Sequence, residues 1–306
     1  MKARISTTQF GKETDVIPGP FDYHAPDSLE EALSLLGEHG DDAKILAGGQ
    51  SLIPAMRFRL ALPAVLIDIN RLSDLEYVRQ DNGSLAIGAM TRETHIEHSE
   101  QVKTAYPMLA DAAEVIADPL VRNRATVGGN LAHADPANDH PAVMLAYQAE
   151  LVAAGPGGER VIPIDEFFTG FFENALSSDE ILTQIRIPKP GADWGGAYLK
   201  IERKVGDYAV AAVAVQLQIN DGACASVRIG LTNVNPQPMR ATEAEQALAG
   251  RELSDQVLEE AGKAAAAQCE PSPDLRGSVE YKRDLVRILT KRAIRKALQR
   301  AKGASS

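Results

Sequence analysis

The sequence predicts an α+β chain in two parts, and three observations support this prediction. Strand-like and helix-like apolar periodicities alternate through the first half of the chain. The segment Pro188-Lys189-Pro190-Gly191 interrupts a strand-like run, because prolines cannot continue a sheet. Beyond it, three strand-like runs precede helical periodicity. The length of 306 residues, at roughly 150 residues per domain, agrees with about two domains.

The composition is that of an ordinary globular protein with an acidic charge balance. The chain has 32 lysine and arginine residues against 42 acidic residues, which argues against a dedicated nucleic-acid binder. The two cysteines, Cys224 and Cys269, are too few for a disulfide framework or an iron–sulfur cluster, which indicates a reducing, cytoplasmic compartment. No apolar run is long enough to predict a membrane span.

The elements before residue 188 predict an arm and two lobes. Polar residues 1–17 predict an extended arm. Ser28-x-x-Glu31 is a capping box before a helix that Gly40 closes. Asn82-Gly83 is typical of a hairpin turn. Strands are expected at 43–46, 65–69, 85–89, 151–154, 161–164 and 181–187, and helices at 53–59 and 106–117.

After residue 188 the pattern predicts three strands and then helices. The strands are expected at 196–201, 209–219 and 225–231, and the helices at 241–249, 254–268 and 279–301. Residues 281–302 contain nine basic residues and one acid, Asp284. Two interpretations of this stretch remain open. It is either a half-buried helix with a solvated basic face, or a basic face that docks an acidic partner subunit.

Two Gly-Gly segments are the strongest functional signals in the residues themselves. One is Ala47 to Ser51, between a predicted strand and helix, and the other is Thr126 to Asn130. Paired glycines let successive backbone N–H groups face one oxyanion with no Cβ in the way. A single such loop is more typical of a tight turn, and neither matches a Rossmann or P-loop motif. Two loops in one chain predict a diphosphate that is held from both sides.

A polar cluster at 133–140 and a pair of motifs further on are weaker signals. The cluster has two imidazoles and two carboxylates, but its spacing matches no metal motif and Pro136 predicts a loop. We therefore expect a loop against a bound ligand, with Asp139 accepting hydrogen bonds from hydroxyls. Without further context, Lys200 and the Asp207-Tyr208 pair read as a surface ion pair and an edge aromatic.

Longer stretches resemble the FAD-binding medium subunits of the xanthine dehydrogenase family of molybdenum hydroxylases. The likeness runs from about residue 18 to about residue 302. RKVGDYAVAAVAV at 203–215 and IGLTNVN at 229–235 favour the branch that oxidises carbon monoxide. The family motifs are FDYHAPDSLEEAL at 21–33, AGGQSLIPAMRFRLALP at 47–63 and IADPLVRNRATVGGNLAHADPANDHPAV at 116–143.

The resemblance implies a fold and a domain division. It implies an FAD-binding domain of the vanillyl-alcohol oxidase (PCMH) type at 18–188, with lobes at about 18–75 and 76–188. A C-terminal domain at 189–306 would hold a three-stranded antiparallel sheet and helices. The arm at 1–17 is extra and receives no role.

The resemblance also implies residue roles around FAD. Asp139 matches an aspartate near the ribityl hydroxyls, and Leu182 matches an apolar residue against the adenine. Lys200 matches a lysine near the pyrimidine edge, and Tyr208 matches an aromatic that shields one flavin face and limits oxygen access. Gln50 stands where carbon monoxide enzymes typically have histidine. The expected cofactor-binding set is Ala47, Gly48, Gly49, Gln50, Ser51, Thr126, Val127, Gly128, Gly129, Asn130, Asp139, Leu182, Lys200 and Tyr208, with no metal ligand in this chain.

The implied activity is electron transfer within a larger oxidoreductase. A large partner subunit would carry the molybdenum cofactor, paired with copper in the carbon monoxide branch, and a small one would carry two [2Fe–2S] clusters. Electrons would pass through FAD to a quinone or other acceptor, in a dimer of heterotrimers. A cytoplasmic location is expected, and contact with the inner face of the membrane through the acceptor stays open. The alternatives are a sibling hydroxylase acting on nicotine, quinoline, a purine or an aldehyde, and a non-enzymatic interaction module with an empty flavin fold.

Overall fold

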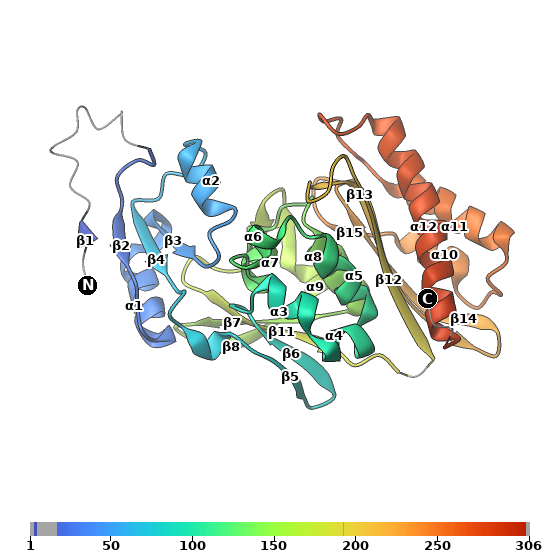
Figure 1. Cartoon of the computed structure of the whole chain (residues 1–306), viewed down its shortest axis with the longest axis horizontal. Helices are drawn as coiled ribbons and strands as arrows, with labels where there is room; N and C mark the ends of the chain where they lie inside the picture. Colours follow the sequence, from blue (N-terminus) through green and yellow to red (C-terminus); the bar gives the residue numbers. More distant parts are fainter. Residues whose placement is uncertain (1–2, 5–16, 192, 304–306) are drawn as a thin grey trace.

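The computed structural model describes residues 3–4, 17–191 and 193–303. Three units follow one another along the long axis of the molecule (Figure 1). The first is a small lobe around strands β2 to β4, the second is a larger lobe around strands β5 to β8 and β11, and the third is a sheet covered by the last three helices. The chain is therefore a mixed α+β protein, as the sequence predicts.

The first lobe is a mainly parallel sheet of strand order β1-β2-β4-β3. Ser28 caps α1 by accepting a hydrogen bond from the Glu31 N–H, and Gly40 ends that helix, so both predicted signals are confirmed. β1 pairs with β2, and residues 5–16 of the expected arm lie outside the described residues. The elements are β1 (Ala3–Arg4), β2 (Asp22–His24), α1 (Leu29–His39), β3 (Ala43–Leu46), α2 (Leu52–Arg57) and β4 (Val65–Asp68), with short 3-10 turns at Gly40–Asp42 and Ser73–Leu75.

The second lobe is built on an antiparallel sheet of strand order β5-β6-β11-β7-β8. Asn82 and Gly83 have φ values of 47° and 81°, the left-handed conformation that a tight hairpin between β5 and β6 requires. The largest apolar core of the described chain lies between this sheet and its helices. The strands are β5 (Val78–Asp81), β6 (Ser84–Gly88), β7 (Glu150–Gly155), β8 (Gly158–Pro163), β11 (Ile181–Pro188) and the small pair β9 (Phe168–Gly170) and β10 (Glu173–Asn174). The helices are α3 (Glu93–His98), α4 (Glu100–Ala105), α5 (Pro107–Val115), α6 (Pro119–Arg122), α7 (Val127–His133), α8 (Asp139–Tyr147) and α9 (Ile164–Phe167).

The C-terminal sheet has four antiparallel strands where the sequence predicts three. The additional strand is β15 (Met239–Arg240), which pairs with β14 and is too short to produce an alternating pattern. The other elements are β12 (Trp194–Glu202), β13 (Ala209–Asn220), β14 (Ala223–Thr232), α10 (Thr242–Leu248), α11 (Asp255–Gln268) and α12 (Val279–Ala301). Helices α5 and α8 of the second lobe contact this sheet, and α12 packs against β12 and β13.

The helix α12 is half-buried, as the first interpretation predicts, and six of its basic residues form ion pairs within the described chain. Lys296 and Arg300 bind Asp111 of α5 at 2.6 to 3.0 Å. Three further basic residues of the helix pair with acids of α11: Arg287 and Lys291 with Glu259, and Arg295 with Asp255. Most of the basic residues of α12 are therefore used in contacts within the chain, and docking of an acidic partner subunit on this helix stays a prediction.

Candidate functional site

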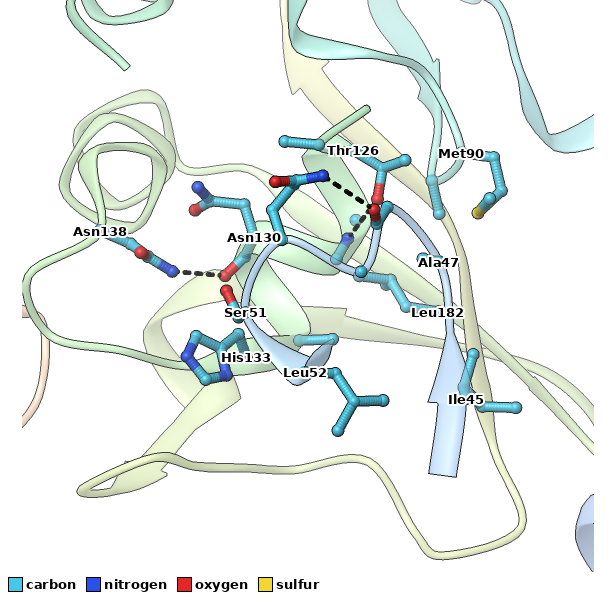
Figure 2. Close-up of a pocket in the computed structure, with 18 of the residues that line it drawn as sticks. Ile45, Ala47, Ser51, Leu52, Met90, Thr126, Asn130, His133, Asn138 and Leu182 are labelled. Atoms are coloured by element: carbon cyan, nitrogen blue, oxygen red, sulfur yellow. Dashed lines mark hydrogen bonds between the residues drawn. The ribbon is translucent and has the colours of Figure 1, made fainter. Parts of the chain in front are cut away.

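A cavity of about 640 Å³ lies where the three units meet. Its size falls within the range of about 300–1,000 Å³ that is usual for small-molecule and cofactor sites. Ser51, His133 and Asn138 gather at one end of the view, and Ile45, Met90 and Leu182 at the other (Figure 2). The cavity therefore has a polar end and an apolar end, which suits an elongated ligand with both kinds of group.

The first Gly-Gly segment, loop 1 (residues 47–51), connects β3 to α2 and lines the cavity. The backbone N–H groups from Gly48 to Ser51 donate no hydrogen bond to another described residue. Gly49 has a φ of +75°, which favours glycine. Backbone donors without a protein partner at a cavity wall form a site for an oxyanion. Loop 1 therefore offers the free amides that the predicted diphosphate site requires, and binding of a diphosphate there stays a prediction.

The second Gly-Gly segment, Thr126 to Asn130, forms loop 2 (residues 124–130) together with the two residues before it, and its backbone N–H groups from Val127 to Asn130 already have partners within the chain. α7 begins at Val127, and the Gly128 N–H donates to the Ala89 carbonyl at 2.9 Å. The Gly129 and Asn130 N–H groups both donate to Thr126. The prediction of free successive amides on both sides is therefore wrong for loop 2. What this loop offers is the Asn130 Oδ1 atom, which is buried, lacks a partner among the described residues and belongs to a cavity-lining side chain.

The glycines mark places where backbones meet. A Cβ on Gly48 would overlap the Arg124 carbonyl oxygen and lie 2.8 Å from the Ala125 Cα. A Cβ on Gly128 would lie 2.5 Å from the Ala89 Cβ. Both distances are shorter than real Cβ contacts allow, so these positions require glycine for close packing. The two loops consequently touch each other directly, and Gly48 is where they touch.

Asp139 lies at the edge of the cavity and joins the second lobe to the C-terminal domain. Its Oδ1 accepts from the Tyr198 hydroxyl at 2.5 Å and its Oδ2 from the Lys200 Nζ at 3.2 Å. Burial raises the pKa of this carboxyl, and the Lys200 ammonium opposes that shift. Lys200 also donates to the Val115 carbonyl and does not line the cavity. The expected lysine is therefore a partner of Asp139, one step back from the cavity.

The remaining predicted residues divide between the cavity and the core. Leu182 of β11 lines the apolar end, and Val127 is fully buried in the core of the second lobe. Gln50 is exposed and its Nε2 turns back to the Gly48 carbonyl at 3.4 Å. Tyr208 lines the cavity and remains 43% exposed. The structure brings together Ala47, Gly48, Gly49, Gln50, Ser51, Thr126, Gly128, Gly129, Asn130, Asp139, Leu182 and Tyr208 around one cavity, and leaves Val127 and Lys200 outside its lining.

Sequence reasoning missed Arg276, which lies over the Tyr208 ring. The guanidinium carbon is 5.5 Å from the ring centroid, and Arg276 forms two hydrogen bonds to Asp207, at 2.7 and 3.2 Å. Arg276 belongs to an irregular segment between α11 and α12, where no periodicity marks a functional residue. The stacked guanidinium and its ion pair hold the ring in one orientation.

Asn138 and His133 complete the polar end. The Asn138 Nδ2 donates to the Asn130 carbonyl at 2.9 Å, which ties α8 to loop 2. Burial lowers the pKa of His133, so this imidazole is neutral near pH 7. Among the described residues that line the cavity, Lys44 is the only lysine or arginine. Recognition of an anion here therefore depends on amide dipoles more than on cations.

A cavity shared by two α+β lobes, with free amides on one wall and a C-terminal sheet domain at its mouth, is the arrangement of an FAD-binding oxidoreductase subunit. Residues 19–190 match the FAD binding domain in molybdopterin dehydrogenase, and residues 196–297 match the CO dehydrogenase flavoprotein C-terminal domain. The chain belongs to this family of FAD-binding subunits of molybdopterin dehydrogenases.

The chain is similar to particular members of that family. It is 44% identical to the carbon monoxide dehydrogenase medium chain of Hydrogenophaga pseudoflava, over 93% of this chain and 99% of the relative. A solved structure of carbon monoxide dehydrogenase from that organism superposes with a TM-score of 0.91 and 46% identity, over 93% of this chain and 99% of the other. Quinoline 2-oxidoreductase from Pseudomonas putida 86 superposes with a TM-score of 0.85 and 34% identity, over 93% and 98%.

Proposed function

We propose that this chain is the FAD-binding, electron-transferring medium subunit of a molybdenum-containing carbon monoxide dehydrogenase. The observation that carries the FAD site is loop 1. Its four consecutive amides, from Gly48 to Ser51, lack partners among the described residues and face a cavity with a polar and an apolar end. The buried, unpartnered Asn130 Oδ1 is a further polar group that a bound ligand would satisfy. These residues fit the cofactor.

Different residues of the cavity bind different parts of the cofactor. Loop 1 amides and the Asn130 Nδ2 donate to the diphosphate, while the Asn130 Oδ1 can accept only from a hydroxyl or amino group of the ligand. Leu182 and its apolar neighbours pack against the adenine. Asp139, held by Tyr198 and Lys200, positions ligand hydroxyls at the edge of the cavity. Tyr208 covers the flavin at the mouth of the cavity and limits the approach of oxygen. The domain division that goes with these roles is 18–188 for FAD binding, with lobes at about 18–75 and 76–188, and 189–306 for the C-terminal domain.

The function of the site is to place and tune the flavin, since no residue of this chain acts on the primary substrate. FAD supplies an acceptor that takes electrons singly and releases them in pairs. We propose that the electrons come from two [2Fe–2S] clusters of a small partner subunit, which receives them from a large subunit with a molybdenum and copper centre. They leave to a quinone or another acceptor. The assembly is a dimer of heterotrimers in the cytoplasm. No described helix has the length and apolarity to cross a membrane.

The proposal is tested by anaerobic reduction of the purified complex with its molybdenum site fully loaded. Carbon monoxide should bleach the visible absorbance of the flavin rapidly, to the extent that dithionite bleaches it. Bleaching by dithionite but not by carbon monoxide would support the role as an FAD subunit and overturn carbon monoxide as the substrate. Absence of flavin from the complex would overturn the FAD role itself.

A sibling hydroxylase is the second candidate, because of the similarity to the quinoline enzyme. The substrate pocket of such complexes would lie in another chain, so the two candidates predict the same FAD site here. Reduction of the flavin by an N-heterocycle or an aldehyde in the same experiment would favour this candidate. A non-enzymatic module with an empty flavin fold predicts instead that the isolated chain retains no yellow colour after incubation with FAD and desalting.

A further inference from the structure

We propose that Arg92 and Asn70 are positioning residues that fix the spacing between loop 1 and loop 2, and thereby set the affinity for the dinucleotide. This inference rests on the proposed FAD site. Neither side chain lines the cavity, and neither belongs to a Gly-Gly segment. Both lie where the first and second lobes meet, behind the two loops.

Asn70 holds loop 1 from behind. It follows β4, and its Nδ2 donates to the Ala47 carbonyl of loop 1 at 2.6 Å. The same Nδ2 and the Asn70 backbone N–H donate to the Asp68 Oδ1, at 2.6 and 2.9 Å. The other oxygen of Asp68 accepts from the Tyr23 hydroxyl at 2.6 Å. The Asn70 amide is therefore fixed by the sheet of the first lobe, and its Oδ1 is left to accept from elsewhere.

Arg92 donates to the Asn70 Oδ1 and links Asn70 to loop 2. One terminal nitrogen of its guanidinium donates to the Asn70 Oδ1 at 2.8 Å, and the other to the Arg124 carbonyl at 2.5 Å. Burial lowers the pKa of Arg92, yet the group stays protonated and keeps both donors. A planar guanidinium is rigid, so two acceptors bound to its two ends are held at one separation.

The Arg124 carbonyl is also the atom against which Gly48 packs. Arg92 thus acts at the point of contact between the two loops. A shift of this joint would move the Gly48 to Ser51 amides relative to the Asn130 side chain. Because a bound group must meet its donors within about 0.5 Å of the productive geometry, such a shift weakens binding without removing any ligand contact. This is the reason to expect an effect on affinity from residues that do not touch the ligand.

The experiment is a titration of the full-length chain, stripped of flavin, with FAD and detection by flavin fluorescence. Arg92→Met keeps the length of the side chain and removes both donors, and Asn70→Ala removes the connection to Ala47. Each variant should bind FAD about tenfold more weakly, which corresponds to about 1.4 kcal/mol of binding free energy. Arg92→Lys keeps the charge without the planar fork and should fall between Arg92→Met and the parent.

Arg228 provides the matched control. It is buried, pairs with Asp165 at 2.7 Å and donates to the Leu145 carbonyl at 2.9 Å, but it lies outside the cavity. Arg228→Met should lower the melting temperature of the flavin-free chain and leave the Kd for FAD unchanged. If Arg92→Met and Asn70→Ala bind FAD within twofold of the parent, or if Arg228→Met weakens binding equally, the positioning role is overturned.

Hydrogen exchange gives a readout that does not depend on FAD. In the flavin-free chain, Arg92→Met should speed amide exchange in residues 124–130, most of whose amides are hydrogen-bonded, and leave α12 unchanged. Unchanged exchange in loop 2 would overturn the inference even if FAD bound poorly. A parent chain that binds no FAD but shows this change in exchange would overturn the proposed function and leave the joint between the loops intact.

Discussion

A glycine is required at position 128, as the sequence predicts, but the physical reason differs from the predicted one. The sequence predicts that a side chain here would block the approach of a diphosphate. In the structure, a Cβ at this position would lie 2.5 Å from the Ala89 Cβ and 2.7 Å from the Ala89 carbonyl oxygen. The glycine is needed because α7 packs its first turn directly on the residues that follow β6.

Gly128→Val should therefore abolish FAD retention by displacing loop 2. Forcing a larger side chain into close packing typically costs about 1–3 kcal/mol and shifts the backbone. The measurement is the flavin to protein ratio after purification. Gly37→Val is the control, because Gly37 is also helical and a Cβ there meets nothing within 4 Å. Full flavin content in Gly128→Val would contradict the proposed role of loop 2.

Tyr208 is the second residue whose role is open to a direct test. Its ring lies at the cavity mouth beneath Arg276. Tyr208→Ala should raise the production of superoxide and hydrogen peroxide by the reduced complex, because it opens a path for oxygen to the flavin. Tyr208→Phe keeps the ring and should behave as the parent. Tyr281→Ala removes a tyrosine of similar exposure, 47%, away from the cavity, and should have no effect. Unchanged oxygen reactivity in Tyr208→Ala would contradict shielding.

At the scale of elements, the contact of α12 with α5 ties the C-terminal domain to the second lobe. Asp111 accepts from Lys296 and Arg300 of α12 and from the Tyr198 N–H of β12. The Asp111 carboxylate therefore links α5 of the second lobe to β12 and α12 of the C-terminal domain. Two basic residues of α12, Lys296 and Arg300, are therefore bound by an acidic residue of the same chain.

Asp111→Asn should lower the free energy of unfolding by about 1.5–3 kcal/mol, since it weakens several charge-assisted hydrogen bonds in a partly buried setting. Urea denaturation of the full chain measures this change. Asp255→Asn in α11 is the control, because Asp255 also pairs with a basic residue of α12. The Asp255 side chain is 87% exposed, so its pair with Arg295 should contribute little to stability. Equal effects of the two substitutions would contradict a special role for Asp111.

At the scale of the whole molecule, α8 is a helix that joins the second lobe to the C-terminal domain. Its first residue, Asp139, binds β12 of the C-terminal domain, and the next, His140, binds Glu93 of α3 at 2.7 Å. Glu93 and His140 are both fully buried. Burial acts to lower the pKa of His140, but the Glu93 carboxylate outweighs it, so that the pKa of His140 is raised.

This pair predicts a stability that depends on pH. A histidine whose pKa is raised on folding stabilises the protein below its unfolded pKa of about 6.5, and that contribution is lost as the pH rises through the folded pKa. The free energy of unfolding, measured in urea from pH 6 upward, should therefore decline as the pH rises above about 6.5. Glu93→Gln should remove the dependence and cost about 3–5 kcal/mol at pH 6, as expected when one partner of a buried pair is lost. A decline of the same size in Glu93→Gln would show that other titratable groups cause the pH dependence of stability.

Local signals were predicted well, because their physics involves only neighbouring residues. The cap at Ser28 and the turn at Asn82-Gly83 depend on hydrogen bonds and φ angles within a few positions of the chain. The positions of α10, α11 and α12 follow from apolar periodicity. β15 escaped prediction because two residues carry no periodicity, and Arg276 because it lies in an irregular segment.

The sequence alone determined the α+β class, the two Gly-Gly segments and the family resemblance that points to FAD. The tertiary structure decided which amides are free. Loop 1 keeps its donors, whereas loop 2 donates to Ala89 and Thr126. It also decided that Lys200 pairs with Asp139, and that basic residues of α12 form ion pairs with acidic residues of α5 and α11. These outcomes depend on contacts between residues far apart in the chain, and a hydrogen-bond donor is available to a ligand only when no such contact has used it.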